Sequence, residues 1–210
     1  MLQKIKRCIL LAVTIAVMVP VVSGFAVTPK QEALNAYNRW LSGAKVQVMP
    51  KGFDELDGVL YTPTPASQTR FAIAYINNDS IPELIVQTSD GVYQSILTYR
   101  NGKIVRIDSS HIVTGLTKGY YSKTGVFVNL SKYFGYKYYI MGTSGITERL
   151  GILTSVTPKE YYYYAKNGKS IPLKNHTELR NKLIAFTKGK ALTPVKFYGN
   201  NAANRKNVLR

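Results

Sequence analysis

The stretch VYQSILTYRNGKIVRI, residues 92–107, decides the fold class of this chain. Two runs rich in β-branched and aromatic residues flank the dipeptide Asn101-Gly102. Asn-Gly favours the type I′ turn, because both central residues of that turn need positive φ angles. The stretch therefore predicts an antiparallel β-hairpin.

Strand-like runs on both sides extend this hairpin. The dipeptide Asn167-Gly168 repeats the turn signal further along the chain. Strands that follow one another through short connections form a meander. We therefore predict a central antiparallel meander, whose other strand candidates are residues 71–76, 84–88, 125–129, 133–141, 146–155 and 161–166.

Amphipathic helical patterns lie before and after the strand-rich region. Thr28 can cap a helix whose first turn contains Pro29, and apolar residues then recur at helical spacing up to Leu41. A second helical pattern covers residues 175–189, with Gly189 as its stop signal. The sequence thus predicts an α+β domain, in which an N-terminal and a C-terminal helix pack on the antiparallel β-meander.

Residues 1–26 have the pattern of a secretory signal peptide. Three cations precede an uncharged, mostly apolar run of 15 residues from Cys8 to Val22, and small residues follow. A membrane-spanning helix needs about 20 apolar residues, so the run is short for a span. We predict cleavage near Gly24 or Ala26 and a secreted or cell-surface location, with a retained membrane anchor as the alternative.

Cleavage would leave one domain, residues 27–199, followed by a basic C-terminal tail, residues 200–210. The length suffices for a single domain with its own core. Cys8 is the only cysteine of the chain. The mature protein would therefore have neither disulfides nor a thiol nucleophile.

Positive charge is concentrated near the C-terminus. The chain has a net charge of +17, and residues 165–210 contain 11 Lys and Arg against Glu178 alone. A field of that sign attracts anionic partners. We expect an anionic cell-wall polymer, a lipid headgroup or an acidic glycan, with nucleic acid as a further open possibility. The residues predicted to contact such a surface are Lys166, Lys169, Lys174, Lys182, Lys188, Lys190, Arg205 and Lys206.

The segment NNDSIPEL, residues 77–84, lies between two predicted strands. It resembles the Asp-rich loop D-x-D-x-D-G-x-P-E-L of FG-GAP/VCBS-type domains in exported bacterial proteins. The chain looks like a single-domain exported protein of this type from Gram-positive bacteria. The resemblance is specific over residues 71–103 and looser over the rest of the mature chain. The resemblance implies a loop that forms a tight turn between two strands, and in that family the oxygens of this loop often bind calcium.

The loop departs from the family pattern at its metal ligands. Tyr75 and Asn77 stand where the resemblance places the first two Asp residues, and only Asp79 and Glu83 are carboxylates. Calcium takes six to eight oxygen ligands. Asn77, Asp79 and Glu83 are therefore candidates for a weak calcium site. We favour a loop that keeps the turn without a cofactor, with Asp79 capping backbone amides and Glu83 tying the loop to its neighbours.

Residues for catalysis are sparse. The chain has two histidines, and the run from Asp108 to His111 combines an acid, hydroxyls and a base. Sequence neighbours rarely adopt triad geometry, and no nucleotide-binding or hydrolase motif is present. We predict no catalytic residues and a non-enzymatic binding or surface-associated module. Two alternatives stay open: an extracellular polymer-acting hydrolase, and a structural or inhibitor-like domain acting through a face formed by its 16 tyrosines.

Overall fold

A computed structural model describes residues 27–52, 61–131, 135–142, 145–154 and 160–210 of the chain. The predicted signal peptide lies outside these residues. The helices are α1 (Pro29–Leu41), α2 (His176–Thr187) and α3 (Ala202–Val208), with a short 3-10 turn at Ala66–Gln68. The strands are β1 (Lys45–Val46), β2 (Thr64–Pro65), β3 (Thr69–Ala74), β4 (Glu83–Thr88), β5 (Tyr93–Arg100), β6 (Lys103–His111), β7 (Leu116–Tyr121), β8 (Val126–Ser131), β9 (Gly135–Met141), β10 (Ile146–Thr154), β11 (Glu160–Lys166), β12 (Lys169–Leu173), β13 (Leu192–Pro194) and β14 (Tyr198–Gly199).

The predicted hairpin is confirmed between β5 and β6. Asn101 and Gly102 have φ angles of 49° and 76°, and Arg100 pairs with Lys103 across the turn. Asn167 and Gly168 do the same between β11 and β12, with φ angles of 51° and 76°. Both turns have the two positive φ values that a type I′ turn requires.

The meander divides into two antiparallel sheets, a division that the sequence pattern did not predict. One sheet has the order β14-β3-β4-β5-β6 and the other β12-β11-β10-β9-β8-β7-β13, while β1 and β2 pair separately. Consecutive strands are neighbours from β3 to β6 and again from β7 to β12. The C-terminal strands β13 and β14 then return to add one edge to each sheet.

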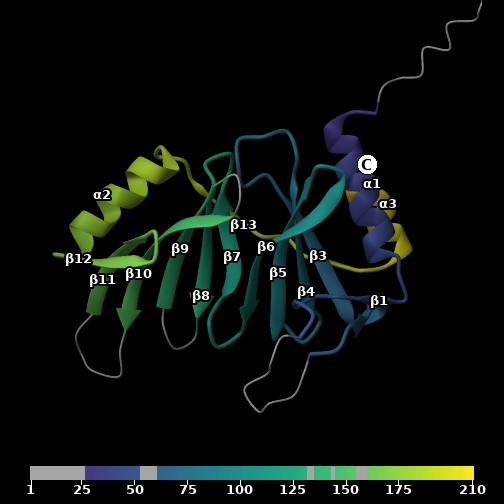
Figure 1. Ribbon diagram of the computed structural model, residues 1–210, viewed down its shortest axis with the longest axis horizontal. Coiled ribbons are helices and arrows are strands. Elements are labelled where there is room, and N and C mark those ends of the chain that lie inside the picture. Colours follow the sequence, from purple (N-terminus) through teal and green to yellow (C-terminus); the bar gives the residue numbers. More distant parts are fainter. Residues whose placement is uncertain (1–26, 53–60, 132–134, 143–144, 155–159) are drawn as a thin grey trace, which may run out of the picture.

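The helices cover opposite ends of the molecule. Figure 1 shows α1 and α3 together beside the five-stranded sheet and α2 over the far end of the seven-stranded sheet. Against the outer face of that sheet, α2 buries Leu179 with Leu150 and Leu173. Among the described residues, no helix has the length and apolar character that crossing a membrane requires. The α+β class with helices packed on an antiparallel meander is confirmed.

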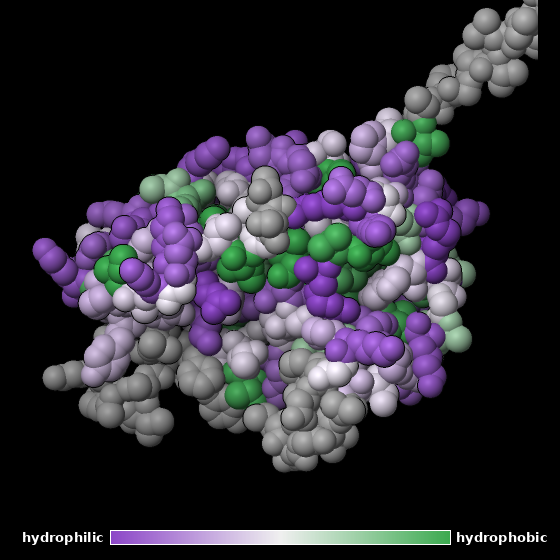
Figure 2. Space-filling view, in the orientation of Figure 1, coloured by the Kyte–Doolittle hydropathy of each residue, from purple (hydrophilic) through white to green (hydrophobic). Residues whose placement is uncertain are grey.

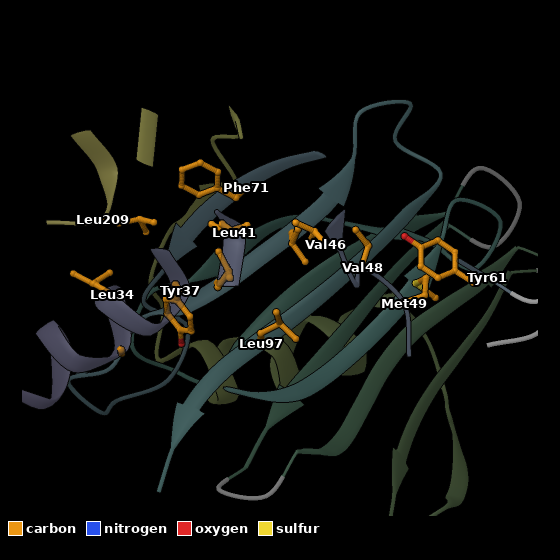
Figure 3. Packing of buried hydrophobic residues seen from close by; sticks show 13 residues of the cluster. Leu34, Tyr37, Leu41, Val46, Val48, Met49, Tyr61, Phe71, Leu97 and Leu209 are labelled. Atoms are coloured by element: carbon orange, nitrogen blue, oxygen red, sulfur yellow. The ribbon is translucent and has the colours of Figure 1, made fainter. Parts of the chain in front are cut away.

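The largest core cluster lies between α1 and the five-stranded sheet. Leu34, Tyr37 and Leu41 of α1 pack with Phe71 and Leu97 of the sheet (Figure 3). Helical spacing places these three α1 residues on one face, as the sequence pattern predicts. The cluster continues along the segment that contains Val46, Val48, Met49 and Tyr61 (Figure 3).

The inner faces of the two sheets form a second cluster. Ile85 and Ile96 of the five-stranded sheet pack with Phe127 of the seven-stranded sheet, and Tyr139 stacks on Phe127 at 5.2 Å between ring centroids. Alternation along each strand sends neighbouring residues to opposite faces. The protein is therefore a two-sheet sandwich with a helical layer on each outer face.

Residues 200–210 do not form a tail apart from the domain. They contain α3, and Leu209 is only 6% exposed in the α1 cluster. Asn200 donates from Nδ2 to the Leu41 carbonyl at 2.9 Å and to Thr69 Oγ1 at 3.1 Å. Its Oδ1 accepts from Arg205 at 2.7 Å. The boundary expected at residue 200 therefore falls within the packed domain.

Candidate functional site

The structure brings the three predicted metal ligands into one loop between β3 and β4. Asn77 Oδ1 accepts from the Asp79 amide at 2.9 Å, and Asp79 Oδ1 accepts from the Ile81 amide at 2.8 Å. Glu83 accepts from the Ile76 amide at Oε2 and from Asn77 Nδ2 at Oε1, both at 2.9 Å. These oxygens therefore receive N–H donors of the loop itself. In the described part of the chain, no group of three His, Cys, Asp or Glu side chains is placed to hold a metal ion.

Glu83 is a fully buried carboxyl group. Burial raises its pKa to about 8, and the nearby charge of Asp79 acts in the same direction, while the Ile76 amide opposes the shift. The Tyr37 hydroxyl of α1 donates to the Pro82 carbonyl at 2.9 Å beside it. Burial, followed by the charge of Glu83, also raises the pKa of Tyr37. The first helix thus fixes the loop from the core side.

The eight predicted surface-contact residues fall into two separate groups. Six lysines lie on or beside β11, β12 and α2, whereas Arg205 and Lys206 lie on α3 at the other end of the molecule (Figure 1). Arg180 of α2 joins the larger group. We name this group the α2-end basic surface; it consists of Lys166, Lys169, Lys174, Arg180, Lys182, Lys188 and Lys190.

Two carboxylates near this surface have defined partners. Glu148 pairs with Lys166 at 3.2 Å and accepts from the Tyr164 hydroxyl. Glu178 accepts from the Lys174 amide at 2.8 Å, while its own amide donates to the N-cap residue of α2. Figure 2 shows hydrophilic residues over most of the α2 end of the visible face. The positive charge at this end is therefore only partly balanced.

The cations of the α2-end basic surface differ in how far they are already engaged by contacts within the protein. Lys182 Nζ lies 4.7 Å from the centroid of the Tyr164 ring, and Lys190 Nζ donates to the Ser122 carbonyl at 2.8 Å. Lys169, Lys174 and Arg180 are exposed. Exposed cations keep their water and meet a charged surface without first losing an internal contact.

The run from Asp108 to His111 does not form a catalytic triad. Ser110 Oγ donates to Asp108 Oδ2 at 2.9 Å and accepts from Asn129 Nδ2 at 3.2 Å. His111 Nδ1 instead accepts from the Val113 amide at 3.2 Å. The base is therefore not placed between the acid and the hydroxyl, as a triad requires. The second histidine, at the start of α2, lies edge-on to a tyrosine ring.

The tyrosines contribute mainly to packing. Tyr138, Tyr162 and Tyr164 contact the α2 cluster. Tyr136 and Tyr161 are 47% and 54% exposed, but strand alternation puts them on opposite faces of the seven-stranded sheet. The two most exposed tyrosines of the described residues therefore do not join in one aromatic patch.

A polar row crosses the inner face of the five-stranded sheet. Arg70, Gln87, Gln94 and Ser110 are paired in register from β3 to β6. Gln87 and Gln94 are 3% and 1% exposed, and Gln94 Oε1 accepts from the Thr117 amide at 3.1 Å. Gln94 Nε2 has no hydrogen-bond partner among the described residues. Buried amides are ordinarily paired, so the Nε2 atom of Gln94 is an exception within this row.

A cleft of about 700 Å³ opens at the Arg70 end of this row. Arg70 Nε donates to Gln87 Oε1 at 2.9 Å, and its guanidinium carbon lies 5.1 Å from the Phe197 ring centroid. Both sheets and the segment before β14 contribute walls. The remaining lining residues are Asp90, Gly91, Ile112, Leu116, Thr117, Lys118, Leu130, Ser131 and Val195.

The residues of this cleft are not evident as a group in the sequence. Gln87 lies near the end of an apolar run, residues 84–88, and Arg70 lies near the start of the preceding strand, so each has the pattern of an ordinary strand-end residue. The one available signal is strand alternation. Arg70 lies next to Phe71 and Gln87 lies next to Val86, and both apolar side chains belong to the cluster on the other face of the sheet. The convergence of Arg70 and Gln87 depends on the register between β3 and β4, which the sequence alone does not define.

Comparison with known proteins gives no match to a protein-family model, to a curated protein or to a solved structure. The resemblance to FG-GAP/VCBS-type domains therefore stays a prediction from the loop sequence.

Proposed function

We propose that this chain is an exported, non-enzymatic binding module that meets anionic envelope material through the α2-end basic surface. The observation that carries the proposal is the clustering of seven cations on β11, β12, α2 and their connections. Opposite charges at a surface attract over roughly 8 Å at physiological salt. A cluster at one end of a domain therefore gives a defined contact face, whereas evenly spread cations would not.

The remaining parts of the proposal come from the sequence. Residues 1–26 have the charge and hydropathy pattern of an export signal, which would deliver the domain to the cell surface or the medium. Outside the cell, anionic polymers and lipid headgroups are the surfaces that a basic face would meet. The degenerate Asp-rich loop then serves as a structural turn, with its carboxylates engaged by N–H groups.

The test compares two variants with equal loss of charge. The α2-end variant combines Lys169→Gln, Lys174→Gln and Arg180→Gln. The far-end control variant combines the same replacement at three cations of α1 and α3, which are Lys30, Arg39 and Lys206. All six side chains are exposed, so neither variant removes core packing.

Binding of both variants is titrated on three defined probes: poly(glycerol phosphate), polygalacturonate and vesicles of phosphatidylglycerol. The proposal predicts that at least one probe binds the unmodified protein, that the α2-end variant binds it at least tenfold more weakly, and that the far-end control stays within about twofold. Equal weakening in both variants would show that only total charge matters. Absence of binding to all three probes would remove the proposal.

A further inference from the structure

We infer that the cleft between the two sheets binds the carboxylate group of an acidic saccharide and that Arg70 receives this group. The cleft lies apart from the α2-end basic surface, and the inference does not depend on the function proposed for that surface. It assigns a specific small-ligand site to residues from β3, β4, β7, β8 and the segment before β14.

Arg70 presents a preorganised guanidinium in the lining of this cleft. Arg70 Nε donates to Gln87 Oε1 at 2.9 Å, and the Phe197 ring lies against the face of the guanidinium. A Cβ atom at Gly91 would lie 3.2 Å from Arg70 Nη2, so this glycine leaves room for the guanidinium. No hydrogen-bond acceptor for Nη1 or Nη2 is found within the described residues. A held arginine fork with free donors suits a carboxylate, which accepts two parallel N–H bonds.

The walls of the cleft carry both positive and negative charge. Lys118 adds a second cation, while Asp90 lines the same cleft. Asp90 Oδ1 accepts from the Val92 amide at 2.9 Å and from the Thr88 hydroxyl. A carboxylate in the lining of the same cleft repels a doubly charged phosphate group more strongly than a singly charged carboxylate, and it accepts hydrogen bonds from ligand hydroxyls. A singly charged group with hydroxyl groups beside it, such as the carboxylate of one sugar unit, fits the pair of Arg70 and Asp90 best.

The size and polarity of the cleft also suit a sugar acid. A volume of about 700 Å³ is in the range of small-molecule sites. Ile112, Leu130 and Val195 supply an apolar wall for the C–H face of a sugar ring. A second cleft of about 540 Å³ also has Asp90 in its lining.

Asp90 is the one carboxylate among the described residues that line the first cleft. Glycoside hydrolysis ordinarily uses two carboxyl groups on either side of the scissile bond. We therefore assign the first cleft to binding of the saccharide and not to its hydrolysis.

The experiment titrates the full-length mature protein with trigalacturonate by calorimetry. Methyl-esterified trigalacturonate is the neutral counterpart, and galactose 6-phosphate presents a doubly charged group in place of a carboxylate. The inference predicts saturable binding of trigalacturonate, at least tenfold weaker binding by Arg70→Gln, and unchanged binding by Arg39→Gln, an exposed arginine of α1. The ester and the phosphate should each bind at least tenfold more weakly than trigalacturonate.

A second variant covers the case in which Arg70→Gln does not fold, which circular dichroism would reveal. Ile112 is 45% exposed on the cleft wall, so Ile112→Glu adds a negative charge there without opening the core. It should weaken trigalacturonate binding at least tenfold. The inference is overturned by absence of saturable binding, by equal binding of the ester, by tighter binding of the phosphate, or by full binding in the folded variants.

Discussion

Replacing Glu83 with glutamine should remove the part of the loss of stability on raising the pH from 5 to 8 that this buried carboxyl causes. Glu83 is fully buried, and burial raises the pKa of its carboxyl to about 8 from an ordinary value of 4.5. Between these two values the folded protein holds a proton that the unfolded chain has released. The folded state therefore binds more protons, and the free energy of unfolding falls as the pH rises through this window.

The magnitude follows from the two pKa values. A difference of one unit corresponds to about 1.4 kcal/mol. Between pH 5 and pH 8 the Glu83 contribution to the free energy of unfolding should fall by roughly 3 to 4 kcal/mol. The glutamine side chain of the Glu83→Gln variant does not titrate, so any constant change in hydrogen bonding to the Ile76 amide cancels when the two pH values are compared.

The assay is urea unfolding followed by the fluorescence of Trp40, the only tryptophan, which packs against the α1 cluster. Free energies of unfolding are measured at both pH values for the unmodified protein, for Glu83→Gln and for Glu32→Gln, an exposed carboxylate of α1. The Glu32 control should follow the unmodified protein. If Glu83→Gln also follows it within about 1 kcal/mol, Glu83 is ionised in the folded state and the reasoning is wrong.

Three further predictions concern the Asp-rich loop and the C-terminal segment. Tyr37→Phe leaves the buried Pro82 carbonyl without its donor and should lower the free energy of unfolding by about 1 to 3 kcal/mol in urea unfolding; an unchanged midpoint would contradict the role of Tyr37 in fixing the loop. Asn200→Ala removes two buried hydrogen bonds from the segment before α3 and should cost about 2 kcal/mol, together with faster amide exchange in α3; a stability like that of the unmodified protein would argue for a loosely attached segment. Addition of millimolar calcium should leave the thermal midpoint unchanged within about 1 °C, because the loop oxygens already accept N–H groups, whereas a rise of several degrees would indicate a filled calcium site.

The parts of the fold that the sequence predicted are those with local causes. Asn101-Gly102 is sufficient to define its hairpin because the turn geometry depends on two residues. Thr28 accepts from the Gln31 amide at 3.2 Å and thereby starts α1 where its capping preference indicates. By contrast, the break between β6 and β7 depends on which strands pair over long distances, and no single residue indicates it.

The functional residues, too, could be predicted only where they do not depend on contacts between distant segments. The lysines of the C-terminal region are evident in the sequence, but their division depends on α2 and α3 lying at opposite ends (Figure 1). The cleft was missed because Arg70, Gln87 and Phe197 come from three segments that only strand pairing brings together. Residues whose role depends on register cannot be recognised from single segments of sequence.

The central claim is that the position of the charge, and not its amount, determines binding to the envelope. The most direct test is co-sedimentation of the α2-end variant and the far-end control with isolated bacterial envelopes, at about 50 mM and about 500 mM NaCl. We predict that the unmodified protein and the far-end control bind at low salt and are released at high salt, while the α2-end variant stays largely in solution at both. Equal binding of the two variants, or binding that is insensitive to salt, would contradict it.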